Sequence, residues 1–449
     1  MYDRDTIVAL ATPLGKGGIG VVRVSGPIVE VITNNLTGRV PKERVATFTE
    51  FMDSKGSPID QGLALFFRSP RSFTGEDVLE IQGHGGPIVM NLIVERVREL
   101  GARLARPGEF SERAFFNDKI DLSQAEAIAD LIDSASNQAA MSAMRSLSGE
   151  FSKKIHRITE SLIELRVFIE AAIDFPEEEI DFLDDPRIGN GLEELIEEIT
   201  DLKLQANQGA LLREGISIVL AGRPNAGKSS LMNRFTGTDT SIVTEIAGTT
   251  RDVIDEHVHL DGVPIRLIDT AGLREGDDPI EIEGVRRAVR EIDQADYVLV
   301  VVDLDSHRED LKDHVELLLQ EIPQNASYLV VLNKADIWQP EAVDLGREYI
   351  LTSALTGLGI DTLKDRLKEG IGYSSGMEGC FIARSRHLEA LQRGLEAVLK
   401  GKALYSDNKA GELLAEELHH CQQALGEITG EFTSDDLLGR IFSNFCIGK

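Results

Sequence analysis

The sequence contains little of what would define several protein classes. Its 449 residues include three cysteines, Cys380, Cys421 and Cys446, and no CxxC pair, so neither a disulfide framework nor a cysteine zinc site is expected. No run of about 18 uncharged apolar residues occurs, which argues against a membrane span. The opening MYDRDTIVAL lacks a basic region and a long apolar run, so we expect no signal peptide and a cytoplasmic location.

Positive charge is also scarce. The chain carries 47 basic and 76 acidic residues, a formal net charge of −29. The net negative charge of such a chain does not attract nucleic acid, so any RNA would have to bind at a local site or through a basic partner. The remaining composition, 42% hydrophobic and 27% charged, is typical of a globular protein too long for one core. We therefore expect two or three domains.

Three kinds of pattern follow one another along the chain. Residues 1–118 alternate short apolar runs with glycine-rich turns, which predicts an α+β domain. Residues 119–214 and 373–449 carry alanine, leucine, isoleucine and glutamate at helical spacing. Between them, residues 215–372 alternate apolar strands with amphipathic helices, the pattern of a doubly wound, mostly parallel sheet. We expect one helical domain, formed from both flanks and interrupted by an inserted α/β domain.

A phosphate-binding loop opens the inserted domain. The strand ISIVLA leads into Gly222-Arg-Pro-Asn-Ala-Gly-Lys-Ser229, and the helix-compatible SLMNRF follows. This strand–loop–helix context supports the pattern G-x-x-x-x-G-K-S. Glycines let backbone N–H groups approach the phosphates, Lys228 reaches the β and γ oxygens, and Ser229 ligates Mg²⁺. The loop predicts nucleotide binding without choosing the base.

The remaining nucleotide motifs follow in order. Asp269-Thr-Ala-Gly272 closes a predicted strand, as a Walker-B aspartate should, and its glycine can sense the γ-phosphate. Asn333-Lys-Ala-Asp336 closes another, and Asp336 can pair with the two guanine N–H donors that adenine lacks. Ser353-Ala354 fits the loop that contacts the guanine O6. Gly248–Asp252 lies where a switch threonine would complete the Mg²⁺ shell. Together the motifs predict a GTPase.

One expected group is missing. The residue after Asp269-Thr-Ala-Gly272 is Leu273, where signalling GTPases carry the glutamine that orients water. Leucine cannot hold a water, so another group must orient the nucleophile. Spacing does not choose among the carboxylates that follow, which include Glu275, Glu281 and Glu283. Nor is an arginine finger identifiable, since Arg251 and Arg274 are interpreted as surface or switch residues.

The chain resembles a known family. Its nucleotide motifs, the phrase RPGEFSERAFFNDKIDLSQAEAIADLI at 106–132 and the ending GEFTSDDLLGRIFSNFCIGK at 430–449 are similar to the MnmE (TrmE) family of tRNA modification GTPases. The resemblance implies work with the flavoprotein MnmG, in a heterotetrameric or larger complex, that installs an aminomethyl or carboxymethylaminomethyl group at carbon 5 of the wobble uridine of certain tRNAs. It also implies a homodimer that contacts tRNA mainly through its partner. No association with a membrane is implied.

The same resemblance implies a tetrahydrofolate-binding amino-terminal domain that dimerises. By motif match, Arg23, Glu80, Lys119 and Lys449 are its candidate folate contacts. Arginine and lysine suit the carboxylates of a folate tail, and Glu80 would accept from pterin N–H groups. The donor would be 5-formyl- or 5,10-methylene-tetrahydrofolate. Cys446 has either a chemical or a structural role there, since the residues after it do not fit a prenylation signal.

Family GTPase domains also dimerise across the nucleotide and bind K⁺ where an arginine finger would place its charge. A cation doing a finger's work would contribute on the order of 10³–10⁵ in rate. The implied roles are K⁺ ligands Asn225, Thr244, Ile246 and Thr249, Mg²⁺ ligands Ser229 and Thr250, and water orienter Glu281. The expected GTP contacts are Asn225, Ala226, Gly227, Lys228, Ser229, Ser230, Thr244, Glu245, Ile246, Ala247, Gly248, Thr249, Thr250, Asp269, Thr270, Ala271, Gly272, Asn333, Lys334, Asp336, Ser353 and Ala354.

A GTP-gated ribosome-assembly factor with a related GTPase domain is the alternative function. It predicts an RNA-binding module beside the GTPase domain and a basic surface. The sequence shows neither a KH-type module nor a net positive charge. The resemblance therefore favours tRNA modification.

Overall fold

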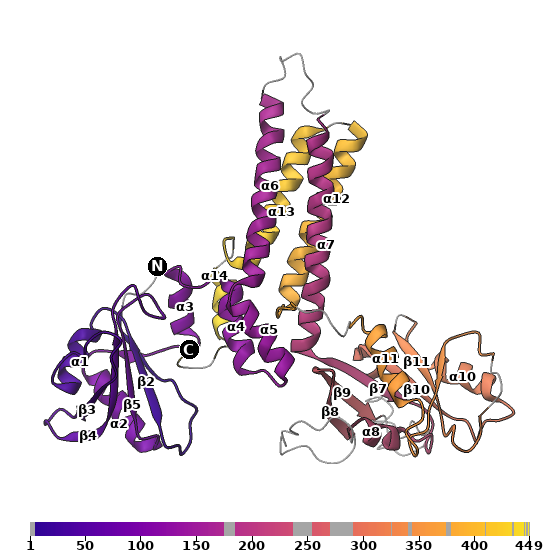
Figure 1. The fold of residues 1–449 in the computed structure, drawn as a ribbon, viewed down its shortest axis with the longest axis horizontal. Helices are drawn as coiled ribbons and strands as arrows, with labels where there is room; N and C mark the ends of the chain where they lie inside the picture. Colours follow the sequence, from indigo (N-terminus) through magenta and orange to yellow (C-terminus); the bar gives the residue numbers. More distant parts are fainter. Residues whose placement is uncertain are drawn as a thin grey trace. The chain divides into compact units, whose positions relative to one another are not determined.

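The chain forms two compact units. The computed structural model describes residues 5–174, 185–236, 254–269, 291–324, 326–339, 344–373, 379–408, 410–432, 435–443, 445 and 448. The first unit is formed by Met1–Ala129, Ser146–Glu197 and Ala390–Lys449, and the second by Asp130–Arg145 and Glu198–Glu389. Figure 1 follows the elements along the chain.

The amino-terminal part of the first unit is a mixed sheet with helices on one face. Its strand order is β3-β4-β5-β2-β1-β6, antiparallel except for the β1–β6 pair. Val22 and Val24 alternate along β2 and pack with residues of α1 and α2, so Arg23 between them faces the other way. The predicted α+β domain is confirmed. The elements are β1 (Ile7–Leu10), β2 (Gly20–Ser25), α1 (Val29–Thr37), β3 (Thr47–Met52), β4 (Pro58–Phe67), β5 (Val78–Gly83), α2 (Pro87–Glu99) and β6 (Arg103–Leu104).

Helices from both flanks of the inserted domain pack together, as the sequence predicted. Figure 1 shows the long helices α6 and α13 side by side, and Arg166 of α6 donates a hydrogen bond to Gln422 of α13 at 2.5 Å. None of the helices in the described ranges is long and apolar enough to cross a membrane. The helices are α3 (Glu109–Phe116), α4 (Leu122–Ile132), α6 (Glu150–Asp174), α7 (Pro186–Glu214), α12 (Ser385–Asn408), α13 (Gly411–Thr429) and α14 (Asp435–Ser443).

The second unit contains the doubly wound sheet. Its order is β12-β11-β10-β7-β9-β8, and every pair is parallel except β8–β9. Alternate residues of β10 enter opposite cores: Leu299 packs with α8 and α11 residues, and Val300 with α10 residues. The elements are β7 (Ile216–Ala221), α8 (Lys228–Thr236), β8 (Ile254–Leu260), β9 (Val263–Asp269), β10 (Tyr297–Asp303), α10 (Leu311–Gln320), β11 (Tyr328–Asn333), β12 (Tyr349–Leu351) and α11 (Ile360–Gly370).

The strand order positions a ligand site. β7 and β10 are neighbours in the sheet, and the chain runs from β7 toward β8 and β9 but from β10 toward β11, so the connections from their carboxyl ends leave in opposite directions. Open α/β sheets bind ligands in the crevice at such a switch point. The phosphate loop follows β7 directly, and the motifs beginning at Asp269 and Asn333 lie at the ends of β9 and β11.

A segment from the helical flank belongs to the second unit. The helix α5 (Asn137–Leu147) begins beside the β8–β9 turn, where the Ser136 hydroxyl donates to the Gly262 carbonyl at 2.8 Å. Just before it, the Asp130 carboxylate accepts hydrogen bonds from Arg213 and Arg384, each at 2.8 Å. The first contact joins the helical flank to the inserted domain, and the contacts of Asp130 join residues from both sides of that domain to each other.

Candidate functional site

The phosphate loop requires its two glycines. Gly222 has φ +152°, and a Cβ there would collide with the carbonyl oxygen of Val301 on β10. Gly227 has φ +91°, and a Cβ there would collide with the Asn333 side-chain amide. Both positions favour glycine for its positive φ and for the close approach of the neighbouring strands. The loop is therefore shaped by the ends of β10 and β11 as well as by its own sequence.

Lys228 lies inside this loop. It is 6% exposed, and its Nζ donates to the Gly222 carbonyl at 2.8 Å and the Arg223 carbonyl at 3.3 Å. Burial lowers the pKa of Lys228, and the nearby Asp269 carboxylate opposes that change. An ammonium held across the loop is suited to anionic phosphate oxygens.

Ser229 and Asp269 form the candidate metal site. The Ser229 hydroxyl, on the first turn of α8, donates to Oδ2 of Asp269 at the end of β9 at 2.8 Å. Asp269 is 1% exposed, and its buried Oδ1 accepts no hydrogen bond from any residue that the structure describes. A buried carboxylate oxygen without a partner is costly. A hydroxyl beside such an oxygen is a donor set that suits Mg²⁺ and its water ligands.

Asn333 connects the phosphate loop to the predicted guanine loop. Its Nδ2 donates to the Ala226 carbonyl at 2.9 Å, while its Oδ1 accepts from the Ala354 N–H at 3.1 Å. Ser353 is fully buried, and its hydroxyl accepts from the Thr356 N–H at 3.1 Å. The structure therefore brings three of the predicted nucleotide segments together. Asp336 lies at an exposed position on the turn that follows β11.

The remaining predicted residues divide into two groups. Asn225, with a left-handed φ of 66°, and Ser230 are exposed beside Lys228 and Ser229. The others lie outside the described residues: Thr244, Glu245, Ile246, Ala247, Gly248, Thr249, Thr250, Thr270, Ala271, Gly272, Glu281, Cys446 and Lys449.

A second candidate site lies on the amino-terminal sheet, on the face opposite α1 and α2. Arg23 of β2 pairs in register with Glu80 of β5, and its Nε and Nη2 donate to Glu80 Oε1 at 3.0 and 2.8 Å. The Arg23 guanidinium lies 5.5 Å from the Phe73 ring centre and 5.8 Å from that of Phe110. Its Nη1 also donates to the carbonyl of Gly448 at 3.4 Å. The site thus joins a charged pair to two aromatic rings.

Lys119 lies near the loop that carries Phe73. It is exposed just after α3, and a Cβ on Gly75 would approach its Cγ to 3.4 Å. Asn117 donates to the Thr74 carbonyl at 2.6 Å, which fixes the end of α3 to this loop. The structure therefore places Arg23, Glu80 and Lys119 on one connected framework.

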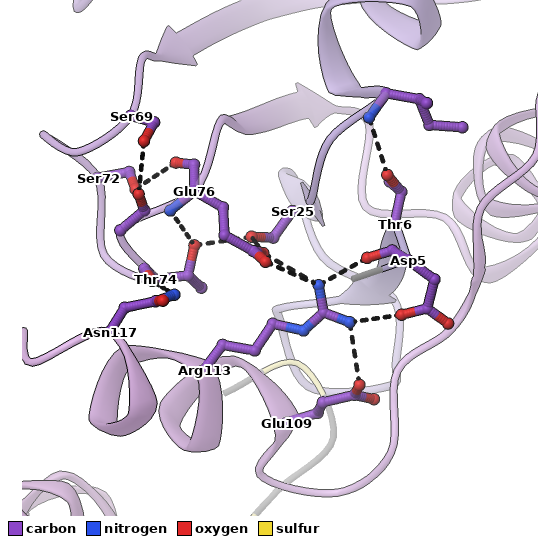
Figure 2. A network of polar contacts seen from close by, with 12 residues as sticks. Asp5, Thr6, Ser25, Ser69, Ser72, Thr74, Glu76, Glu109, Arg113 and Asn117 are labelled. Atoms are coloured by element: carbon purple, nitrogen blue, oxygen red, sulfur yellow. Dashed lines mark hydrogen bonds and ion pairs between the residues drawn. The ribbon is translucent and has the colours of Figure 1, made fainter. Parts of the chain in front are cut away.

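Arg113 is the centre of that framework (Figure 2). Its side chain is fully buried, and it donates to the carboxylates of Asp5 at 2.8 Å, Glu76 at 3.0 Å and Glu109 at 3.1 Å. Burial raises the pKa of Glu109, but hydrogen bonds from Arg103, the Arg106 N–H and Arg113 outweigh it and lower that pKa to about 2. The network ties α3, with Phe110, to the loop with Phe73.

Sequence reasoning missed this network and also the ion pair between Asp303 and Lys334, whose Oδ2 and Nζ are 2.6 Å apart. Glu109 and Arg113 are four residues apart on a short helix, the spacing of an ordinary surface pair. Asp303 carried a usable signal, because it ends the fully buried strand YVLVVVD at the edge where the nucleotide motifs gather.

Comparisons with known proteins find relatives over the whole chain. The family models described as "GTP-binding protein TrmE N-terminus" and "MnmE helical domain" match residues 6–119 and 122–446. The chain is 54% identical over 457 residues to the tRNA modification GTPase MnmE of Vibrio cholerae O395, covering 99% of each chain. It is 54% identical over 454 residues to that of Proteus mirabilis HI4320, covering 100% of each.

Solved structures with partial likeness contain GTPase domains. A variant of Aquifex aeolicus Era bound to GDP and AlF₄⁻ is 26% identical, covers 40% of this chain and 66% of its own, and has a TM-score of 0.29. The G domain of the Thermotoga maritima iron transporter FeoB is 27% identical, covers 34% and 98%, and has a TM-score of 0.28. Both scores are too low to bear on the fold of the whole chain.

Proposed function

The chain belongs to the MnmE (TrmE) family of tRNA modification GTPases, and from this premise we propose that its GTP hydrolysis drives modification at carbon 5 of the wobble uridine. The product would be an aminomethyl or carboxymethylaminomethyl group. In this proposal hydrolysis requires Mg²⁺, is stimulated by K⁺ and is coupled to dimerisation of the GTPase domains. The flavoprotein MnmG would be the partner.

The observation that carries the proposal is the set formed by Lys228, Ser229 and Asp269. The ammonium of Lys228 would bind and neutralise the β- and γ-phosphate oxygens. The Ser229 hydroxyl and the unpartnered Oδ1 of Asp269 would hold Mg²⁺ and its water ligands. When bound, the metal supplies positive charge to the phosphate oxygens of the transition state. Asp336 would select guanine by accepting hydrogen bonds from the two N–H donors of the base.

Support for a K⁺ site comes from Asn225. Its left-handed φ and its exposure place an amide-bearing residue on the outer side of the phosphate loop. Asparagine is one of the few residues that adopt this conformation readily, and its amide oxygen is a suitable ligand for a hard cation. Thr244, Ile246 and Thr249 are proposed from the family resemblance, as is Glu281 for orienting water.

Hydrolysis by the purified chain is expected to be faster in KCl than in NaCl by about tenfold or more, because K⁺ would do part of an arginine finger's work. Asn225→Ala should remove the difference, whereas Asn233→Ala, exposed on α8, should keep it. Glu281→Ala should lower the rate in both salts. Single-turnover phosphate release measures all four. Equal rates in the two salts would contradict the potassium proposal.

Support for a folate site comes from the pair of Arg23 and Glu80. Each side chain is 20% exposed, and Phe73 and Phe110 flank the guanidinium. The two hydrogen bonds that Arg23 donates to Glu80 both go to Oε1, so among the described residues Oε2 remains for the N–H groups of a pterin. Arg23, with Lys119 and Lys449, would bind the carboxylates of the folate tail. The bound 5-formyl- or 5,10-methylene-tetrahydrofolate would supply the one-carbon unit.

The proposed assembly follows from charge and family. A net charge of −29 disfavours direct capture of tRNA, so the chain would reach tRNA mainly through MnmG, in a heterotetrameric or larger complex. The chain itself would be a homodimer, with contacts through the amino-terminal domains and, during hydrolysis, through the GTPase domains. We place this complex in the cytoplasm.

Nucleoside analysis of tRNA tests the function. Cells lacking the chain should lose the modified wobble uridine, and a Lys228→Ala copy should not restore it. Arg23→Met should also fail to restore it while the purified variant keeps its GTP hydrolysis, because Arg23 and the nucleotide motifs belong to different units of the chain. Arg98→Met, an exposed change on α2, is the matched control and should restore it. Unchanged wobble uridine together with defective ribosome assembly would favour the alternative function.

A further inference from the structure

A second carboxylate, Asp303, lies beside the base-recognition motif. β10 and β11 pair in parallel, and their register places Asp303 opposite Asn333. The N–H of Leu304 donates to the Asn333 carbonyl at 3.1 Å, which fixes the backbone after Asp303 against the motif. Asp303 is 7% exposed. A carboxylate this buried is costly unless it is paired, so its partners matter.

The ionic partner of Asp303 is Lys334. Its Nζ lies 2.6 Å from Asp303 Oδ2, which also accepts from the Ser306 hydroxyl at 2.7 Å. Asp303 Oδ1 accepts from the Asp305 N–H at 3.0 Å. Burial raises the pKa of Asp303, but the hydrogen bonds from Lys334 and Ser306 outweigh it and hold that pKa below its ordinary value. The carboxylate is therefore ionised, and its hydrogen bonds fix its position.

Lys334 also shapes the turn that presents Asp336. Its φ of 67° is left-handed, a strained conformation for a residue that is neither glycine nor asparagine. Its carbonyl accepts from the Ile337 N–H at 3.0 Å and closes the turn over Asp336. The ammonium held by Asp303 therefore belongs to a residue only two positions from the carboxylate proposed to read guanine.

We propose that Asp303 is a positioning residue for guanine specificity, which holds the Lys334 ammonium so that the Asp336 carboxylate stays available to the base. The inference rests on the proposed role of Asp336. Without Asp303, the ammonium of Lys334 is drawn to Asp336, because opposite charges a few ångströms apart attract strongly near a protein surface. That ion pair competes with the guanine N–H donors for the same oxygens.

The GDP-to-IDP affinity ratio reports the relevant contact, because hypoxanthine lacks the exocyclic amine of guanine. Competition of GDP and IDP against a fluorescent GDP analogue measures it on the full-length chain. Asp303→Asn is expected to lower the ratio about tenfold, the size of one hydrogen bond to a charged group. Asp305→Asn, the same charge change in the same turn with its side chain on Arg308, is the control and keeps the wild-type ratio.

Removing the ammonium separates this mechanism from a structural one. Lys334→Met keeps a similar stem without charge, and because Lys334 is itself an expected nucleotide contact, its loss should weaken GDP and IDP binding alike. That variant and the Asp303→Asn, Lys334→Met double variant are therefore both expected to keep a ratio close to the wild-type value. A ratio in Asp303→Asn that matches Asp305→Asn, or a low ratio in Lys334→Met, overturns the inference. Equal GDP and IDP affinity in the wild-type chain, unchanged by Asp336→Asn, overturns the base site itself and the inference with it.

Discussion

The Asp336→Asn variant should lose GTP affinity by about 10³-fold or more and gain affinity for xanthosine triphosphate. In the proposed site Asp336 would accept from the two N–H donors on the edge of guanine, whereas an asparagine amide would present a donor where guanine also donates. Xanthine carries an oxygen at the position of the exocyclic amine and accepts from that amide. Loss of guanine and gain of xanthine recognition together would identify Asp336 as the residue that reads the base.

Equilibrium competition with the two triphosphates measures this exchange. Asp361→Asn, the same charge change at an exposed position on α11, should bind both nucleotides like the wild-type chain. If Asp336→Asn lost GTP affinity and gained no affinity for xanthosine triphosphate, the result would instead indicate that the turn after β11 had collapsed. Unchanged GTP affinity would show that another residue reads the guanine edge.

The second large effect concerns stability. Arg113→Met should lower the free energy of unfolding of the amino-terminal part by about 3–5 kcal/mol, because it removes the buried cation that the buried Glu109 carboxylate shares with the partly buried Asp5 and Glu76. Arg113 is fully buried and donates to Asp5, Glu76 and Glu109. Arg106→Met is the matched control, because its side chain is 63% exposed, and it should cost less than about 1 kcal/mol.

The loss of unfolding free energy in Arg113→Met should depend on pH. The pKa of Glu109 is about 2 in the folded chain and 4.5 in its ordinary state, so its ionised form stabilises the fold above pH 4.5. That contribution disappears as the pH falls toward 2. Arg113→Met raises the folded pKa of Glu109, so the difference in unfolding free energy between the two chains should narrow as the pH falls from about 4.5 toward 2. Chemical denaturation across this range measures it, and a constant gap would show that Arg113 acts through packing alone.

The fold could be predicted from the sequence to the extent that periodicity carries it. The apolar runs from Ile216 to Leu351 indicated a doubly wound sheet, and the order β12-β11-β10-β7-β9-β8 confirmed it. Helical spacing occurs on both sides of the α/β segment. The simplest explanation is one helical domain with the α/β domain inserted into it, so the sequence indicated that arrangement. Lys228 and Ser229 could be predicted because they belong to one contiguous motif, in which the phosphate loop itself sets the spacing of the residues.

Partners across different strands could not be predicted in the same way. The Ser229–Asp269 hydrogen bond and the Asp303–Lys334 ion pair depend on strand register, which no local pattern encodes. Arg113 was missed because burial depends on the chain that folds over a helix, and its own helix is as charged as a surface helix. The sequence also suggested separate roles for Arg23 and Glu80, whereas the structure pairs them.

The contact between Arg23 and Gly448 has a consequence for how the proposed folate site around Arg23 and Glu80 is made. The two residues are 425 positions apart, so the ribosome must synthesise almost the whole chain before the site can close. Gly448 has φ +96°, and a Cβ there would collide with the Leu10 carbonyl oxygen. The sheet that bears Arg23 can fold early, but its site is completed late. Chains interrupted during translation would therefore carry a GTPase domain without a finished site around Arg23.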